Sequence, residues 1–211
     1  MIRNVNVVCG TRLVLLVWLL AGAAGCAVQS PAVRFYLLTP FASETPSKEA
    51  ARPPSGLRLG MGPIVLPDYL DRPQMVRRQG ANQIFVSQNE RWAEPLKTNF
   101  SRVLLENLNS LLETNEIYLF PWTHRKVTVD YRVEIDVYRF EGGPGRQVTL
   151  SARWMVSRGG DQRAVLHKQT AFQREATSAA TGGVVAALNR LLTELSREIA
   201  AGIMRLEVES P

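Results

Sequence analysis

The chain has 211 residues, and its 25 basic and 19 acidic side chains give a formal net charge of +6. It contains only two cysteines and two histidines, which argues against a disulfide-stapled domain and against a metal site built from these residues. The length predicts one folded domain with an adequate hydrophobic core.

The N-terminus has the pattern of an export signal. Arg3 and Arg12 precede an uncharged apolar run at 13–20, and small residues at 21–25 lead directly to Cys26. A positive start, a short apolar core and small residues before a cleavage site are typical of secretory signals. A cysteine directly after the small residues indicates a lipoprotein signal, in which a diacylglycerol alkylates the thiol before cleavage and the freed amine is then acylated. We therefore expect Cys26 to be lipidated.

An ordinary signal peptide and an uncleaved membrane anchor are the alternatives for this segment. Ala23 departs from the lipoprotein pattern, because such signals usually carry leucine at this position. Gln29 and Pro31 argue against a membrane anchor, because they interrupt the run of ~20 apolar residues that an anchor needs. Several acyl chains on Cys26 would hold the protein stably to a membrane. The predicted organisation is a signal peptide at 1–25, a lipidated tether at 26–32 and one domain at 33–205 with a flexible segment at 41–56.

Cleavage before Cys26 would leave a mature chain without a free thiol, because Cys9 is removed and Cys26 is capped. A disulfide, a thiolate zinc site and a cysteine nucleophile are then excluded. Nucleic acid is not an expected partner of such an exported chain, which carries no recognised nucleic-acid-binding motif.

The remaining sequence alternates between short strand patterns and two long helical patterns. The helices are predicted near 92–115, with Leu108 in the middle of the apolar face, and at 182–204, with Leu192 in the same position. The patterns predict an α/β fold, a single domain in which two long amphipathic helices cover a mixed, largely antiparallel sheet. Strands are predicted at 33–38, 57–61, 74–78, 83–87, 117–120, 131–138 (with a bulge near 139–140), 148–156 and 164–172, the last as an edge strand.

No constellation of residues typical of catalysis is present. His124 and His167 have no partner at metal-ligand spacing, and we expect both to be solvated surface residues. Glu134 and Asp136 fall on the polar face of a predicted strand, where carboxylates are expected to be solvated or paired with arginines. The sequence also lacks a phosphate loop, a dinucleotide fingerprint and a serine-nucleophile motif. We therefore expect a non-enzyme without cofactor or metal.

Residues 63–74 form an unusual segment whose prolines argue against a regular helix or a central strand. Tyr69 and Leu70 are large groups on this irregular segment, and Asp71 and Arg72 follow as polar neighbours. Interfaces favour such a mixture of apolar anchors and polar rim groups. Two interpretations stay open: the segment is an interface for a partner, or it folds back and buries Tyr69 and Leu70.

Several of these segments resemble the auxiliary lipoproteins of ABC-type transporters, the PqiC-like family. The similar residues are Gly62-Pro63, residues 66–74, residues 91–96 with the sequence Arg-Trp-Ala-Glu-Pro-Leu, and Pro121-Trp122. The resemblance also covers the strand after the lipid site and the last helix, and thus nearly the whole mature chain.

The resemblance implies a place in an intermembrane lipid-transport system of a Gram-negative envelope. Its members are non-enzymatic lipoproteins of the outer membrane that form a homo-oligomeric ring, and the ring receives the tip of a tunnel of MCE (mammalian cell entry) domains, a PqiB-like partner. Ala27 after Cys26 agrees with outer-membrane delivery, because Asp at this position favours inner-membrane retention in enterobacterial sorting. The competing interpretations are a lipid- or small-molecule-binding lipoprotein and an envelope-assembly lipoprotein of another translocon.

Overall fold

The computed structural model describes residues 31–41, 56–120, 127–160 and 163–209. The chain divides into two compact units at Ala32, and the second unit, Val33–Pro211, contains every described strand and helix. Their order is β1 (Arg34–Tyr36), β2 (Leu59–Val65), the 3₁₀ turn η1 (Asp68–Leu70), β3 (Gln74–Arg78), β4 (Ile84–Trp92), α2 (Leu96–Leu111), β5 (Ile117–Leu119), β6 (Tyr131–Gly142), β7 (Gln147–Arg158), β8 (Ala164–Glu175) and α3 (Thr181–Glu209).

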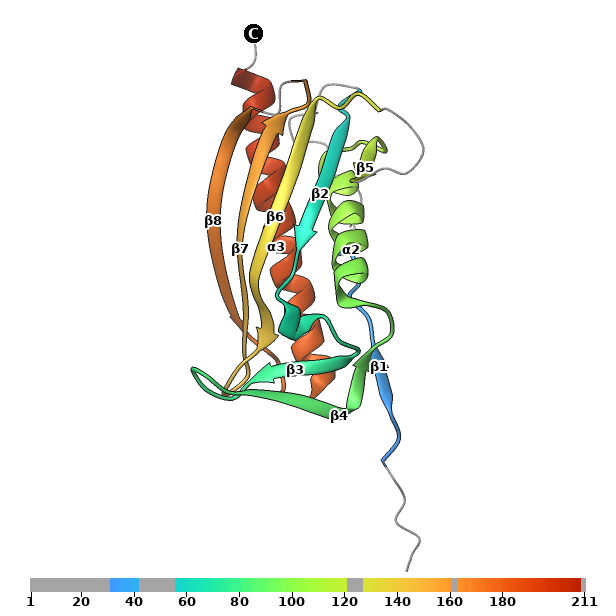
Figure 1. Cartoon of the computed structure of the whole chain (residues 1–211), viewed down its shortest axis with the longest axis vertical. Coiled ribbons are helices and arrows are strands. Elements are labelled where there is room, and N and C mark those ends of the chain that lie inside the picture. Colours follow the sequence, from blue (N-terminus) through green and yellow to red (C-terminus); the bar gives the residue numbers. More distant parts are fainter. Residues whose placement is uncertain (1–30, 42–55, 121–126, 161–162, 210–211) are drawn as a thin grey trace, which may run out of the picture. The chain divides into compact units, whose positions relative to one another are not determined.

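One mixed sheet of eight strands forms around β6 (Figure 1). On one side, β6, β7 and β8 make the two longest ladders, and both are antiparallel. On its other side, β6 pairs in parallel with β2, and its last residues pair with β3. The sheet ends at β5 beside β2, at β1 beside β4, and at β8. This topology confirms the predicted fold class, including the position of β8 at an edge.

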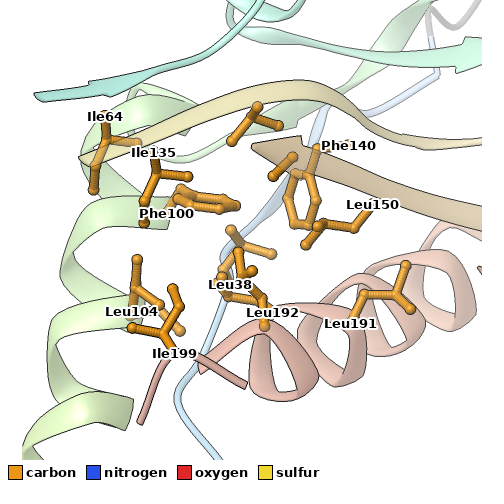
Figure 2. Packing of buried hydrophobic residues seen from close by; sticks show 14 of the residues in the cluster. Leu38, Ile64, Phe100, Leu104, Ile135, Phe140, Leu150, Leu191, Leu192 and Ile199 are labelled. Carbon is orange, nitrogen blue, oxygen red and sulfur yellow. The ribbon is translucent and has the colours of Figure 1, made fainter. Parts of the chain in front are cut away.

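Both helices lie on one face of the sheet and bury their apolar sides against it (Figure 2). Strict alternation along β6 turns Val133 and Ile135 inward, where they meet the helical layer. Phe100 of α2 packs edge-on against Phe140 of β6 with ring centroids 5.2 Å apart. The register of β6 shifts between Val137 and Arg139, which confirms the predicted bulge and returns Phe140 to the buried face.

Asparagine side chains of the two helices hold the segment that follows β1. The fully buried Asn99 accepts a hydrogen bond from the Leu38 amide at 2.6 Å and donates to the Leu38 carbonyl at 3.1 Å. Asn107 accepts from the Phe41 amide at 3.1 Å, and Asn189 of α3 accepts from the Thr39 amide at 3.2 Å. Residues 38–41 are therefore attached to both helices through their backbone.

The structure corrects the prediction that no part of residues 63–74 belongs to a central strand. Pro63 lies within β2, between β5 and β6. Proline has no amide hydrogen for the ladder, but the register of β2 on β6 shifts between Met61 and Ile64, so the missing donor falls at the irregularity. Gly62 is required there, because its φ is +118° and a Cβ would lie 2.9 Å from the Phe120 carbonyl oxygen.

Helix α2 also begins later than predicted, at Leu96, because Trp92 ends strand β4 and is buried in the core. Strand β4 is longer than the predicted 83–87, and its register on β3 shifts between Gln74 and Val76. β4 pairs with β3 along one edge, and its last residues pair with β1 along the other. Within the described ranges, neither helix is both long enough and apolar enough to cross a bilayer.

Leu108 of α2 and Leu192 of α3 are both fully buried, as predicted. Replacement of either leucine by alanine is expected to lower the free energy of unfolding by about 2–5 kcal/mol, because apolar contacts are lost and a cavity remains. Chemical denaturation of the domain measures this loss. Val208→Ala is the matched control, since Val208 is 85% exposed at the end of α3 and its truncation should change stability by less than about 0.5 kcal/mol. Equal effects at buried and exposed positions would contradict the packing.

Candidate docking site

Segments that lie far apart in the sequence, and that carry the family resemblance, meet in the structure. The Trp92 amide donates to the Pro73 carbonyl at 2.7 Å, and the Ala93 amide donates to the Tyr36 carbonyl at 2.9 Å. Gln74 is also in register with Arg91 across the β3–β4 ladder. The irregular segment at 66–74 therefore packs beside the end of β4, and β1 lies on the other side of β4.

The centre of that segment is the short 3₁₀ turn η1. Pro67, whose φ is −61°, precedes the turn, and the Leu70 amide closes it by donating to the Pro67 carbonyl at 2.9 Å. Leu70 points inward and is buried in the core. Asp71 and Arg72, the next residues, are exposed.

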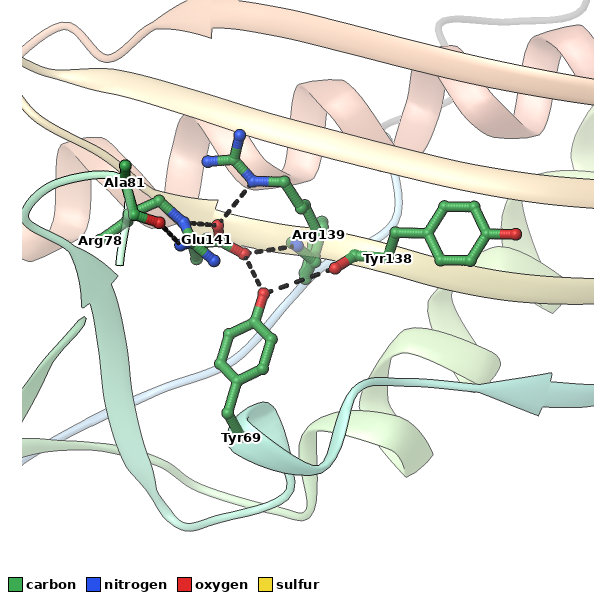
Figure 3. A network of polar contacts seen from close by, with 7 residues as sticks. Tyr69, Arg78, Ala81, Tyr138, Arg139 and Glu141 are labelled. Carbon is green, nitrogen blue, oxygen red and sulfur yellow. Dashed lines mark hydrogen bonds and ion pairs between the residues drawn. The ribbon is translucent and has the colours of Figure 1, made fainter. Parts of the chain in front are cut away.

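Tyr69 attaches the turn to the sheet (Figure 3). Its hydroxyl donates a hydrogen bond of 2.8 Å to Glu141 Oε2, near the end of β6. It also lies 3.5 Å from the Tyr138 carbonyl oxygen. Because the bond to Glu141 joins a side chain of the loop to a buried carboxylate, it is stronger than a bond between neutral groups.

The carboxylate of Glu141 is fully buried and accepts from three further donors (Figure 3). Oε1 accepts from Arg78 Nε at 3.0 Å and from Arg139 Nε at 2.9 Å, and Oε2 accepts from the Phe140 amide at 3.0 Å. Arg78 continues the network, since it donates to the Ala81 carbonyl at 3.0 Å in the β3–β4 turn. We call Tyr69, Arg78, Arg139 and Glu141 the Glu141 network.

The network changes the pKa of its acidic members in opposite directions. Burial by itself would raise the pKa of Glu141, but the hydrogen bonds from Tyr69, Arg139 and Arg78 outweigh it and hold this pKa below its ordinary value. Burial and the bond to Glu141 raise the pKa of Tyr69 to about 12. At neutral pH the carboxyl is therefore ionised and the phenol is a proton donor.

The residues predicted as an interface thus occupy different environments. Leu70 belongs to the core, and Tyr69 is half-buried in the Glu141 network. Asp71 and Arg72 are the two exposed members, held in place by the residues before them. Cys26, the predicted lipidation site, lies outside the described residues.

An open groove of about 930 Å³ lies beside the network and is lined in part by Arg34, Arg77 and Arg78. Arg77 donates to the Ala179 carbonyl at 2.9 Å and to the Thr181 hydroxyl, and Arg78 is bound to Glu141. The guanidinium groups of Arg77 and Arg78 therefore already have protein partners that hold the start of α3 and the end of β6.

The carboxylates considered in the sequence are paired with arginines, as expected. Glu134 lies 3.2 Å from Arg132 Nε, and Asp136 lies 2.7 Å from Arg153 Nη2. Within the described ranges, no group of His, Cys, Asp and Glu side chains is placed to hold a metal ion. His167 is exposed on β8, whereas His124 falls outside these ranges.

Sequence reasoning did not identify Glu141 or the helix asparagines. Glu141 lies beyond the predicted strand at 131–138 and directly before a glycine-rich stretch, whereas in the structure β6 continues to Gly142 and includes it. Asn99 and Asn107 lie among leucines on the buried side of α2, and polar residues in that position were the available signal.

Tyr69→Phe tests the network without disturbing the core. Loss of a hydrogen bond to a charged acceptor should lower the free energy of unfolding by about 1.5–3 kcal/mol at neutral pH. Since the pKa of Glu141 is lowered in the folded state, its stabilising contribution is complete above the ordinary value of 4.5 and is lost as the pH falls through the folded pKa. The difference between wild type and Tyr69→Phe should therefore shrink in acid.

Denaturation of both proteins between pH 7 and pH 3 measures this dependence. Tyr138→Phe is the control, because Tyr138 has an exposed ring and contributes only its backbone carbonyl to the contact with Tyr69. A Tyr69→Phe protein as stable as wild type at pH 7, or a difference that does not change with pH, would contradict the assignment.

Comparison with known proteins places the chain in a family. A family model described as the ABC-type transport auxiliary lipoprotein component matches residues 36–200. Among curated proteins, no sequence matches the chain. A crystal structure of a Xanthomonas campestris protein has 20% identity and a TM-score of 0.65, and the match covers 83% of this chain and 97% of that one. A crystal structure of an uncharacterized protein has 19% identity and a TM-score of 0.64, with 82% and 99% covered. These likenesses support the fold, and the family match, which spans most of the chain, shows that the protein belongs to the ABC-type transport auxiliary lipoproteins.

Proposed function

We propose that the protein is a non-enzymatic outer-membrane lipoprotein of an MCE-type intermembrane lipid-transport system. In this role it forms a homo-oligomeric ring that receives the tip of a PqiB-like tunnel, and it supports membrane integrity. The observation that carries the proposal is the family match over residues 36–200, a family of lipoproteins that assist ABC-type transport.

The anchor in this proposal is a lipid on Cys26. The apolar run, the small residues and the cysteine follow one another in the order that lipoprotein processing requires. The segment 26–32 then acts as the tether, and the domain begins near Val33, the first residue of the second compact unit.

The proposed contact with a partner is the exposed part of the loop, Asp71 and Arg72. The Glu141 network and the burial of Leu70 fix the backbone on which these two residues stand. A preordered loop loses little conformational entropy when it binds, so modest polar contacts can suffice. The partner is either a neighbouring protomer of the ring or the MCE tunnel.

A lipid carrier is the main competing function, and the groove of about 930 Å³ is the observation that favours it. Lipid extraction separates the two functions, because a carrier purifies with stoichiometric phospholipid and a docking subunit with little. Two of the groove arginines already bind protein groups, and this supports the docking function.

Affinity isolation of the lipidated protein from envelope membranes tests the proposal. We expect wild type in the outer-membrane fraction, recovered as an oligomer together with an MCE-domain protein. Cys26→Ser should leave the precursor uncleaved or mis-sorted and lose both the outer-membrane fraction and the partner, because neither lipid transfer nor lipoprotein-specific cleavage can occur without the thiol. Recovery of wild type mainly from the inner membrane would contradict the localisation, and repeated recovery with a different translocon would contradict the function.

A further inference from the structure

Exposed apolar side chains line one face of β1 and the residues on either side of it. Val33, Phe35 and Leu37 alternate along the chain with Arg34 and Tyr36, and they are 42%, 63% and 43% exposed. Phe35 lies in β1, and Val33 and Leu37 directly flank the strand, so the three form one apolar row on one side of this extended stretch. We call Val33, Phe35 and Leu37 the β1 apolar row.

On the long strands β6, β7 and β8, the face away from the helices is mainly polar, although Tyr138 of β6 is also exposed, as is Val65 of β2. Arg132 of β6, Arg153 of β7 and His167 of β8 stand on it, and the first two are paired with carboxylates. That is the usual composition of a solvated sheet face. An exposed apolar row on an edge strand departs from this rule and marks an interaction surface.

β1 lies close in sequence to Cys26, the proposed site of the lipid anchor. Val33 follows Cys26 by seven residues, a stretch that spans at most about 25 Å when fully extended. The asparagine contacts to residues 38–41 attach the other end of β1 to both helices, so β1 is fixed to the domain. A lipid on Cys26 therefore keeps the β1 apolar row close to the bilayer in every copy, whether or not copies assemble.

The charges beside the row suit a phospholipid surface. Arg34 lies on the same strand with its side chain 69% exposed, and Arg91 is opposite Phe35 in the β1–β4 ladder. The only ion pair described for Arg34 is with Glu90 at 3.6 Å. Basic side chains around exposed apolar groups are attracted to anionic headgroups while the apolar groups enter the acyl boundary.

We propose that the β1 apolar row rests on the phospholipid surface of the membrane that holds the lipid anchor, and that it orients the domain on that membrane. The proposal rests on the proposed lipidation of Cys26. Because the anchor makes the contact intramolecular, a few apolar side chains suffice for it. A second copy of this chain covering the same row is the competing occupant.

Single-cysteine labelling tests the contact directly. The mature chain has no free thiol once Cys26 is acylated, so Phe35→Cys can carry an environment-sensitive fluorophore as the only label. The lipidated protein is placed in vesicles of phosphatidylethanolamine and phosphatidylglycerol that contain a nitroxide-labelled lipid. Two controls outside the proposed contact carry the same label: Arg190→Cys on the exposed side of α3, and Val208→Cys at the exposed end of α3.

We expect the nitroxide lipid to quench the label at position 35 at least threefold more than the label at 190 or 208, at any ratio of protein to lipid. Equal quenching at the three positions would overturn the proposal. A label at position 35 that is shielded from water only at high protein density, with energy transfer between labelled copies, would overturn the proposal. That result would show that a second copy of this chain covers the row. Circular dichroism checks the fold of each variant, and Leu37→Cys repeats the test within the row.

Intact mass separates this inference from the function on which it rests. A mature protein without acyl groups on Cys26 would contradict the proposed anchor. An acylated protein whose label at position 35 is not preferentially quenched would contradict only the contact made by the β1 apolar row.

Discussion

The proposed docking site depends on the hydrogen bonds that the buried carboxylate of Glu141 accepts. A fully buried charge is tolerated only when its hydrogen-bonding capacity is satisfied, and here the donors come from different parts of the chain: Tyr69 from the loop, Arg78 from β3, and Arg139 with the Phe140 amide from β6. Satisfying this one charge therefore sets the position of the loop on the sheet. The loop contains little regular structure of its own, yet its exposed residues occupy a defined place.

A second set of polar contacts fixes the position of residues 38–41, near the N-terminal edge of the domain. The backbone of residues 38–41 is bound by three side chains of the helices, those of Asn99, Asn107 and Asn189. These side chains accept hydrogen bonds that a neighbouring strand would otherwise accept. These bonds attach residues 38–41, which follow β1, to the two helices and not to the loop at 66–74. The anchored end and the proposed docking loop are consequently held by separate groups of the same core, so each can be altered without the other.

The regular elements could be predicted because their pattern is local. Alternation along β6 and β7 and the leucine spacing of the helices determine which side of each element is buried. Pro63 in β2 could not be placed, since its tolerance depends on a register shift against β6. The burial of Leu70 and the role of Glu141 depend on contacts between distant segments, which periodicity does not report. The loop was therefore recognised as unusual, but its division into buried and exposed residues required the structure.

The most direct test of the docking account is site-specific photo-crosslinking in intact Gram-negative cells, with a photoreactive residue at position 72. The same residue at position 190, on the exposed side of α3, is the control. If Asp71 and Arg72 form the docking contact, the photoreactive residue at position 72 crosslinks to a second copy of this chain or to an MCE-domain protein well above the level at position 190. A folded, membrane-bound protein that crosslinks equally weakly at both positions would contradict it.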